Sequence, residues 1–421
     1  MLNINMEPEN DSRIDKETTL KVMRIIMRYI DKLVNKNTEN TTSAVANLFV
    51  LLELFEYTND KTILEETIHK QLIQLKLQLD RRMGIGLFNG FGEIALMCEL
   101  LEKKTNSYYK LNTTVHQHLY SITENYLKYC NSVVPKIYQS DYDVISGLSG
   151  VGYYLLDKPE AQSICKKILD YISRLLETKV YNGKVVPVWH IIPDNQFHIG
   201  HENYIDGHFN YGLSHGLAGP LAYLTKFNTF ECGTDMSRDL LVKVVEIFKL
   251  AMIDIDDVIY WPGLLQYTDY IKENYSKETA LQSTTWCYGN LSISKILYNA
   301  SLILEDTLLE KTMLTNITNI CEKTSDSFKF GCPIICHGYC GAILTLVCSR
   351  LQFSKWGKED SYAKAIDFLV KMTLRYYDYN ENAFVETSDK GGFLDGEQGI
   401  ILALISAIKN RTSVGKHLLI D

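Results

Sequence analysis

Three residues that lie far apart in the sequence have the side chains of a zinc site: Cys287, Cys336 and His337. Zn²⁺ prefers tetrahedral sulfur and nitrogen ligands, and two thiolates balance its charge. Three protein ligands leave a fourth position open for water or an incoming thiolate, as in catalytic rather than structural zinc sites. We therefore expect one zinc ion per chain, bound by these three residues, that activates a thiol.

Further residues near the same glycines offer acid–base chemistry. His215, Tyr288 and Asp395 each stand one residue before a glycine, and Asp143 stands four residues before one. An imidazole can accept and return a proton, a carboxylate can orient it, and a phenol can donate a hydrogen bond. We expect His215, Asp143 and Tyr288 to be catalytic, and Asp395 could join them. The alternatives are a packed histidine, a helix-capping aspartate and a core tyrosine.

Two other groups of residues could bind a metal. Cys332, Cys336 and Cys340 are spaced by four residues and could form a local cluster. One segment also contains four histidines, namely His190, His198, His201 and His208. We favour Cys287 together with Cys336, because both stand two residues before a glycine. The histidines have no matching cysteines, which favours surface or turn positions for them.

Glycines place these residues in a repeat. Six segments share a plan of apolar residues, a short turn with glycine, and then an apolar helix. Their first shared glycines are Gly90, Gly147, Gly216, Gly289, Gly338 and Gly396, separated by 57, 69, 73, 49 and 58 residues. Such periods are typical of repeat architectures. In a closed ring, equivalent positions meet at one end of the axis. The ligands and the acid–base residues should converge there, at helix N-termini whose positive partial charge favours thiolates.

The segments between the glycine motifs predict amphipathic helices. In residues 17–34 apolar side chains recur every three or four residues, and 43–57 and 359–377 are similar. Each repeat therefore pairs an outer amphipathic helix with an inner apolar one. Six pairs predict an all-α fold, an α/α toroid of about twelve helices. Residues 179–211, with prolines, β-branched residues and aromatics, predict a small β-containing insertion on one face. Residues 1–421 are expected to form a single domain.

Composition and charge exclude other classes of protein. The 421-residue chain is 46% hydrophobic and 22% charged, as is typical of soluble globular proteins. Its net charge of −8 argues against a broad nucleic-acid-binding surface. Its polar, acidic start lacks the features of a signal peptide, and no run approaches the roughly 18 apolar residues of a membrane span. We expect a cytoplasmic protein without membrane insertion.

The segments YDVISGLSG, GLSHGLAG, WCYG and CHG, with the closing glycine motif, resemble the LanC family of lanthionine synthetase C-like cyclases. The chain is most similar to its class I members of the nisin and subtilin type, over essentially its whole length. The resemblance implies an α/α toroid with a small extra domain on one face. It also implies zinc bound by Cys287, Cys336 and His337. One departure is Ser283, which stands where the nisin-type pattern has an arginine.

The resemblance further implies a role in lantibiotic biosynthesis. A partner dehydratase converts Ser and Thr of a precursor peptide, which carries a leader, to dehydroalanine and dehydrobutyrine. The cyclase then adds a peptide Cys thiolate to the alkene, giving a lanthionine or methyllanthionine thioether. His215 is the candidate for proton transfer, Asp143 would orient it, and Tyr288 would donate a hydrogen bond. An ABC exporter is a further expected partner, in a complex that would hold the protein at the membrane. The insertion at 179–211 is a candidate leader-binding surface.

Three other functions fit parts of the pattern. A glutathione-binding LanC-like protein would bind a thiol without cyclase turnover. A zinc-dependent thiol-alkylating enzyme similar to prenyltransferases would share the helical barrel, but its zinc would need an aspartate ligand as well. A zinc-free α/α-barrel glycosidase would use two carboxylates and would leave the Cys and His candidates without a role.

Overall fold

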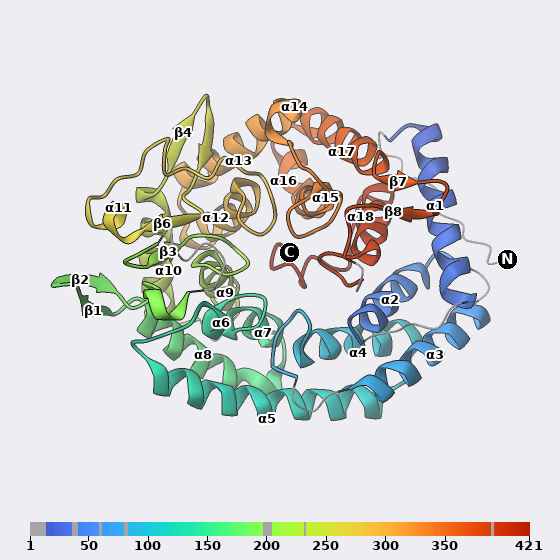
Figure 1. Cartoon of the computed structure of the whole chain (residues 1–421), viewed down its shortest axis with the longest axis horizontal. Coiled ribbons are helices and arrows are strands. Elements are labelled where there is room, and N and C mark those ends of the chain that lie inside the picture. The colour runs from blue at the N-terminus through green and yellow to red at the C-terminus, as the bar shows by residue number, and fades with distance from the viewer. Residues whose placement is uncertain are drawn as a thin grey trace.

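The computed structural model describes residues 14–35, 41–58, 61–79, 83–196, 204–230, 233–388 and 391–421. Two concentric layers of helices surround a central axis (Figure 1). The inner layer consists of α2 (Thr41–Leu54), α4 (Phe91–Thr105), α7 (Leu148–Leu155), α9 (Ala218–Phe227), α12 (Asn290–Leu304), α15 (Tyr339–Cys348) and α18 (Glu397–Lys409). The outer layer consists of α1 (Lys16–Asn35), α3 (Thr62–Gln78), α5 (Tyr109–Val133), α8 (Gln162–Leu175), α10 (Asp235–Leu250), α13 (Thr307–Glu322) and α17 (Glu359–Leu374).

The inner layer closes on itself. Each inner helix packs against the next one along the chain, and α18 packs back against α2. The predicted all-α toroid is therefore confirmed. The predicted number of helices is wrong, because the described part of the chain has seven inner and seven outer helices rather than six of each.

The helix pair that was not predicted as a repeat consists of the outer helix α1 and the inner helix α2. We interpreted 43–57 as an outer amphipathic helix, but α2 lies in the inner layer between α4 and α18. Its side chains are buried almost all round, including Phe49 at 2% exposed and Leu51 at 0%. Residues 36–40, which lead into this helix, contain no glycine, so an alignment of the sequence on glycines could not find it.

The inner and outer helices differ in side-chain burial, as the sequence predicts. In the outer helix α8, the apolar side chains of one face are buried, while Lys166, Lys167 and Asp170 on the other face are exposed. In the inner helix α15, every residue from Tyr339 to Val347 is buried. The inner helices therefore form the core, and the outer helices shield it from solvent.

A β-containing region projects from one side of the ring (Figure 1). Strands β1 (Thr178–Tyr181) and β2 (Lys184–Pro187) pair with each other, and β3 (His208–Asn210) follows. The antiparallel partner of β3 is β6 (Leu264–Gln266), which belongs to the next connection and precedes the short helix α11 (Tyr267–Ile271). The region is thus built from two chain segments, and the predicted 179–211 covers one of them.

The sequence of the second segment contains a turn pattern that favours a β-hairpin. Strands β4 (Ile253–Ile255) and β5 (Val258–Tyr260) form a hairpin, and its two turn residues Asp256 and Asp257 have positive φ angles of 52° and 64°. Aspartate tolerates this conformation, and Asp-rich two-residue turns are typical of hairpins. A last small hairpin joins β7 (Tyr377–Asp378) and β8 (Ala383–Phe384).

The remaining helices are short connectors. They are α6 (Gln139–Tyr142), α14 (Thr324–Ser327), α16 (Arg350–Lys355), η1 (Pro159–Ala161) and η2 (Pro193–Asn195). Across the described residues, no helix combines the length and the apolar character that crossing a membrane requires.

Candidate active site

The loops that precede the inner helices are joined by backbone hydrogen bonds. Val144 N donates to Ser214 O at 3.0 Å, and Ser214 N donates to Cys287 O at 3.0 Å. Cys287 N then donates to Cys336 O at 3.2 Å, and Cys336 N to Leu394 O at 3.2 Å. Each loop is thus fastened to the next one around the ring. The convergence that the glycine alignment predicts is produced by these bonds.

Glycine is required in these loops because the backbone folds back on itself. Gly338 precedes the first residue of α15, and a Cβ on it would lie 2.4 Å from Cys332 O and 2.6 Å from Ile334 O. Gly289 is as crowded, since a Cβ there would lie 2.1 Å from Thr285 N. These contacts are far below van der Waals distance, so the tight entry holds the residues just before each helix at its N-terminus.

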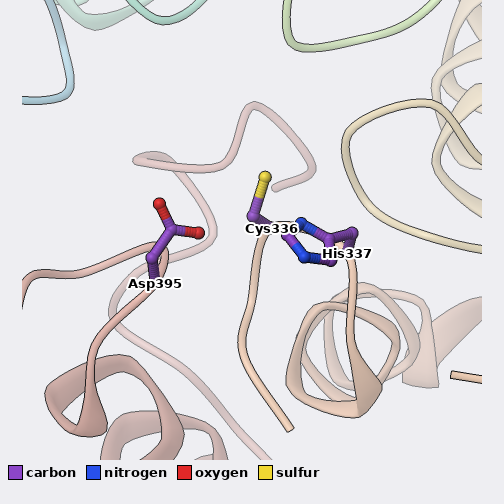
Figure 2. Close-up of side chains that lie close together, drawn as sticks. All are labelled: Cys336, His337 and Asp395. Atoms are coloured by element: carbon purple, nitrogen blue, oxygen red, sulfur yellow. The ribbon is translucent and has the colours of Figure 1, made fainter. Parts of the chain in front are cut away.

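Three side chains from two of these loops gather around one space (Figure 2). Cys336 and His337 come from the loop before α15, and Asp395 comes from the loop before α18. One possible ligand atom of each lies within 4.8 Å of those of the other two. Sulfur, nitrogen and carboxylate oxygen are all zinc ligands, so this donor set fits a zinc ion.

Cys287 lies beside this group but is not part of it. The interaction between the Cys287 and Cys336 thiols lowers the pKa of Cys287 and raises that of Cys336. Cys287 Sγ also lies 3.7 Å from Thr285 Oγ1, which is 3.1 Å from Ser283 Oγ. The structure thus brings together Cys336, His337 and both candidate third ligands, Cys287 and Asp395.

The local cysteine cluster does not assemble. Cys340 is buried within α15, where its sulfur lies 3.9 Å from Thr373 Oγ1 and burial raises its pKa. Among the residues that the structure describes, neither Cys332 nor Cys340 belongs to a group of three close ligand atoms.

The histidine-rich segment is also not a metal site in its described part, since His190 and His208 join no such group. Our interpretation of them as surface or turn residues is wrong, because they are 0% and 3% exposed. His190 Nε2 lies 3.0 Å from Asp206 O, and His208 Nε2 lies 2.6 Å from Gln139 Nε2. Burial lowers the pKa of both to about 4. His198 and His201 lie outside the described residues.

His215 and Asp143 form the predicted pair. His215 Nδ1 lies 2.6 Å from Asp143 Oδ2, and the aspartate side chain is 1% exposed while the histidine is 28% exposed. The other carboxylate oxygen, Oδ1, accepts hydrogen bonds from Ser146 N at 2.7 Å and Gly147 N at 2.8 Å. Asp143 therefore holds the backbone at the entry to α7 with one oxygen and contacts His215 with the other, while its catalytic role stays a prediction.

Tyr288, in the adjacent loop before α12, lies beside His215. Its ring centroid is 6.5 Å from that of His215, and its hydroxyl accepts a hydrogen bond of 3.2 Å from Asn210 Nδ2. Burial raises the pKa of Tyr288 to about 12, so the phenol keeps its proton at neutral pH. The ring also packs against Gly212, where a Cβ would lie 2.4 Å from it.

The C-terminal segment that contacts these loops was not predicted. The segment 411–421 lies inside the inner ring (Figure 1), and His417 stacks against both Phe88 and Phe393, at 4.5 and 4.2 Å between ring centroids. Next to Cys287, Trp286 Nε1 donates to Leu418 O at 3.0 Å. Phe88 stands two positions before Gly90, where the other five motifs have no aromatic residue, so the motif alignment held no signal for this contact.

Comparisons with known proteins agree with this architecture. A family model for lanthionine synthetase C-like proteins matches residues 22–419. The chain is 28% identical over 407 residues to the nisin biosynthesis protein NisC of Lactococcus lactis subsp. lactis, covering 92% of this chain and 91% of that protein. The solved structure of a nisin cyclase matches with a TM-score of 0.75 at 24% identity, covering 96% of this chain and 98% of that one, and so has the same fold. The chain therefore belongs to the lanthionine synthetase C-like family.

Proposed function

We propose that the protein is a zinc-dependent lanthionine synthetase that closes thioether rings in a dehydrated precursor peptide. A peptide Cys sulfur forms a bond to the β-carbon of dehydroalanine or dehydrobutyrine, and a proton is delivered to the α-carbon. The observation that carries the proposal is the juxtaposition of soft metal ligands with the His215–Asp143 pair on loops joined by backbone hydrogen bonds. The similarity to a nisin biosynthesis protein and to a nisin cyclase supports it.

Cys336 and His337 would hold the zinc, with Cys287 as the third ligand. A bound zinc lowers the pKa of a coordinated thiol and keeps its sulfur nucleophilic at neutral pH. Because Asp395 also lies in the ligand group, it is the alternative third ligand. The thiols of Cys336 and Cys287 interact, as expected for two sulfurs that can approach one ion.

His215 is suited to carry the proton from the thiol to the product. With Nδ1–H donating to Asp143, Nε2 of the neutral imidazole carries no proton and can accept that of the thiol. The resulting imidazolium, stabilised by the buried carboxylate, can return that proton to the α-carbon after the carbon–sulfur bond has formed. The same proton thus leaves the sulfur and ends on carbon, so the addition is balanced.

Tyr288 is suited to stabilise the enolate that forms before protonation. Its oxygen already accepts a hydrogen bond from Asn210, which leaves its own proton available to a substrate carbonyl oxygen. Ser283 stands where the nisin-type pattern has an arginine. Its hydroxyl is hydrogen-bonded to that of Thr285 and carries no positive charge. We therefore assign the stabilisation of the enolate to Tyr288.

A groove beside Tyr288 offers a path for the peptide. Its volume is about 470 Å³, and it runs from Tyr288 past Leu281 and Gln266 to Tyr204 of the β-containing region. We propose that the precursor peptide and its leader bind along this face, and that the whole chain acts as one domain. A dehydratase that supplies the alkene and an ABC exporter that removes the product are the proposed partners, in a cytoplasmic complex at the membrane.

The decisive experiment measures zinc per chain and cyclisation of a dehydrated peptide in the same preparations. The wild type should carry about one zinc ion, and Cys336→Ala and His337→Ala should lose both zinc and ring formation while remaining folded. Cys287→Ala should behave like them, whereas Asp395→Asn should keep its zinc. Zinc-free, folded wild type after purification in zinc-containing buffer would overturn the proposal.

One observation favours a second candidate. Asp395, rather than Cys287, lies within the close ligand group, and a Cys–His–Asp set is the one expected of a zinc enzyme that alkylates thiols with a prenyl diphosphate. Loss of zinc in Asp395→Asn but not in Cys287→Ala, together with prenylation of a thiol peptide, would establish this alternative.

A further inference from the structure

A cavity of about 430 Å³ lies near the other end of the ring from the Cys and His residues. It is bounded by α9, α12, the end of α15, α16 and the segment 411–421. Lys295 and Asn299 in its wall follow Gly289 by six and ten residues, which at about 1.5 Å per helical residue places them roughly 9 and 15 Å further along α12. The cavity is therefore separate from the candidate active site, and its volume is in the range of small-molecule sites.

The central feature of this cavity is a buried ammonium group without a counter-ion. Lys295 is 2% exposed. Its Nζ donates to Asn299 Oδ1 at 3.2 Å, and Gln352, with its amide turned to present oxygen, accepts at 2.9 Å. Both acceptors are neutral, and no carboxylate of the described residues lies within 4.0 Å of Nζ. An ammonium has three N–H donors, so one remains without a protein acceptor.

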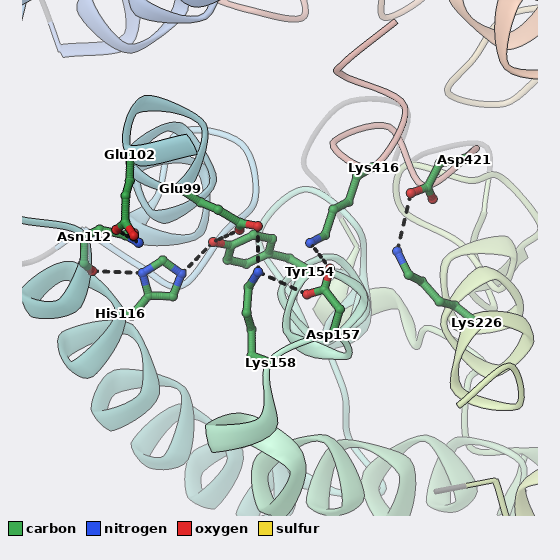
Figure 3. A network of polar contacts seen from close by, with 10 residues as sticks. All are labelled: Glu99, Glu102, Asn112, His116, Tyr154, Asp157, Lys158, Lys226, Lys416 and Asp421. Carbon is green, nitrogen blue, oxygen red and sulfur yellow. Dashed lines mark hydrogen bonds and ion pairs between the residues drawn. The ribbon is translucent and has the colours of Figure 1, made fainter. Parts of the chain in front are cut away.

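The nearby acidic group is already engaged. Asp421 accepts a hydrogen bond from Tyr153 and forms an ion pair of 3.5 Å with Lys226 (Figure 3). Lys226 Nζ also lies 4.0 Å from the centre of the Tyr153 ring. Asp421 thus pairs directly with Lys226 and, with no ion pair to Lys295, offsets the charge of that buried ammonium only in part. A buried cation of this kind is costly unless an anion accompanies it.

Apart from Thr225 and Thr229, the rest of the wall is largely apolar. It includes Ala222, Ile296, Leu302, Ile303, Leu351 and Leu419. Leu302 is 44% and Leu351 74% exposed, so these two form a rim that is open to solvent. An anion that binds here loses its hydration. Apolar surface on the same molecule would offset this cost by packing against the apolar side chains of the wall.

We propose that this cavity binds a small aliphatic monocarboxylate, with its carboxylate on Lys295 and its hydrocarbon chain against the leucine and isoleucine side chains. A single negative charge balances Lys295, whereas a dianion such as phosphate would also meet the carboxylate of Asp421. The proposal does not depend on the chemistry at the other end of the ring.

Calorimetric titration of the full chain with octanoate, acetate, inorganic phosphate and octanamide tests the proposal. Octanoate should bind with one site per chain, and each of the other three should bind at least tenfold more weakly, because each lacks either the chain or the single charge. Lys295→Met should weaken octanoate binding at least tenfold and should raise the melting temperature of the ligand-free protein. Lys243→Met, at an exposed position on α10, is the matched control and should change neither.

A second variant keeps the test decisive if Lys295→Met does not fold. Leu302→Trp adds bulk at the open rim and should weaken octanoate binding while leaving zinc content unchanged. Failure of octanoate to bind the wild type, equal binding of octanamide, or undiminished binding to Lys295→Met would each overturn the proposal.

Discussion

The two ends of the inner helices carry opposite charges. Thiol, imidazole and carboxylate groups stand before the N-termini, as Cys336, His337 and Asp395 do. Lysines stand in the last turns, namely Lys103 and Lys104 in α4, Lys226 in α9 and Lys409 in α18. The helix macrodipole favours anions at the first end and cations at the second. Parallel helices in one closed ring thus give the toroid one end suited to thiolates and an opposite end suited to lysine side chains.

The two ends also differ in what holds them together. At the N-terminal end, backbone hydrogen bonds join successive loops, and glycines permit the close approach. At the other end, side chains form the links (Figure 3): Glu99 pairs with Lys158 at 2.7 Å, and Lys158 and Lys416 both reach Asp157, at 3.2 and 2.5 Å. A backbone hydrogen bond cannot be replaced by changing one side chain, whereas a side-chain ion pair can be. The site end should therefore be far less tolerant of mutation.

The largest effect is expected from Gly338→Ala. The new methyl carbon would lie 2.4 Å from Cys332 O, so the loop before α15 must shift and carry Cys336 and His337 with it. Unfolding free energy should fall by about 2–4 kcal/mol, with loss of zinc. Gly331→Ala is the matched control, since nothing lies within 4 Å of its Cβ position. Chemical denaturation and metal analysis of both variants measure the effect. Equal unfolding free energy and equal zinc content in the two variants would contradict the proposed rigidity of the loop.

Asp143→Asn should affect catalysis more than structure. The amide can still accept the hydrogen bonds of Ser146 N and Gly147 N, but it carries no charge to stabilise the imidazolium of His215. We expect kcat for ring closure to fall roughly 10²-fold or more with zinc content unchanged. A parallel fall in zinc content would show that Asp143 acts mainly as a structural cap.

The sequence predicts the site better than it predicts the ring. Six glycine motifs suffice to place Cys287, Cys336, His337 and His215 at one end, because glycine is demanded wherever a loop meets a helix this closely. The seventh helix pair has no such glycine and was missed.

Contacts between segments that are far apart in the chain could not be predicted from the sequence either. His417 stacks on Phe88, 329 positions earlier in the chain, and β3 pairs with β6 across an intervening helix pair. Neither contact leaves a local pattern. The choice between Cys287 and Asp395 as third ligand depends on side-chain positions of a few ångströms, which spacing alone does not determine.

A buried acid at the N-terminal end should make stability pH-dependent. Burial raises the pKa of Glu93, in the first turn of α4, from 4.5 to about 7, although its carboxylate accepts a hydrogen bond from Asn89 N at 2.9 Å. The folded state therefore binds this proton more tightly than the unfolded state. The resulting stability is present below pH 4.5 and is lost as the pH rises toward 7.

Glu93→Gln isolates this contribution, because glutamine keeps an acceptor for Asn89 N. The variant should be more stable than the wild type above pH 7 by up to about 3 kcal/mol, and the difference should shrink as the pH falls toward 4.5. Glu17→Gln, at an exposed position on α1, is the control. Denaturation curves between pH 4.5 and 8 measure the effect, and a pH-independent difference would contradict it.

The smallest effect is expected at the opposite end. Lys416 pairs with Asp157 at 2.5 Å and lies 4.8 Å from the centre of the Tyr154 ring, but Asp157 keeps a second partner in Lys158. Lys416→Met should lower unfolding free energy by about 1 kcal/mol or less, and less still in high salt. Zinc content and ring-closure rate should not change. Lys167→Met, which breaks the exposed pair with Glu124, is the control. A marked loss of zinc in Lys416→Met would show that the two ends are coupled through the segment that carries His417, and would remove the contrast between a rigid site end and a tolerant opposite end.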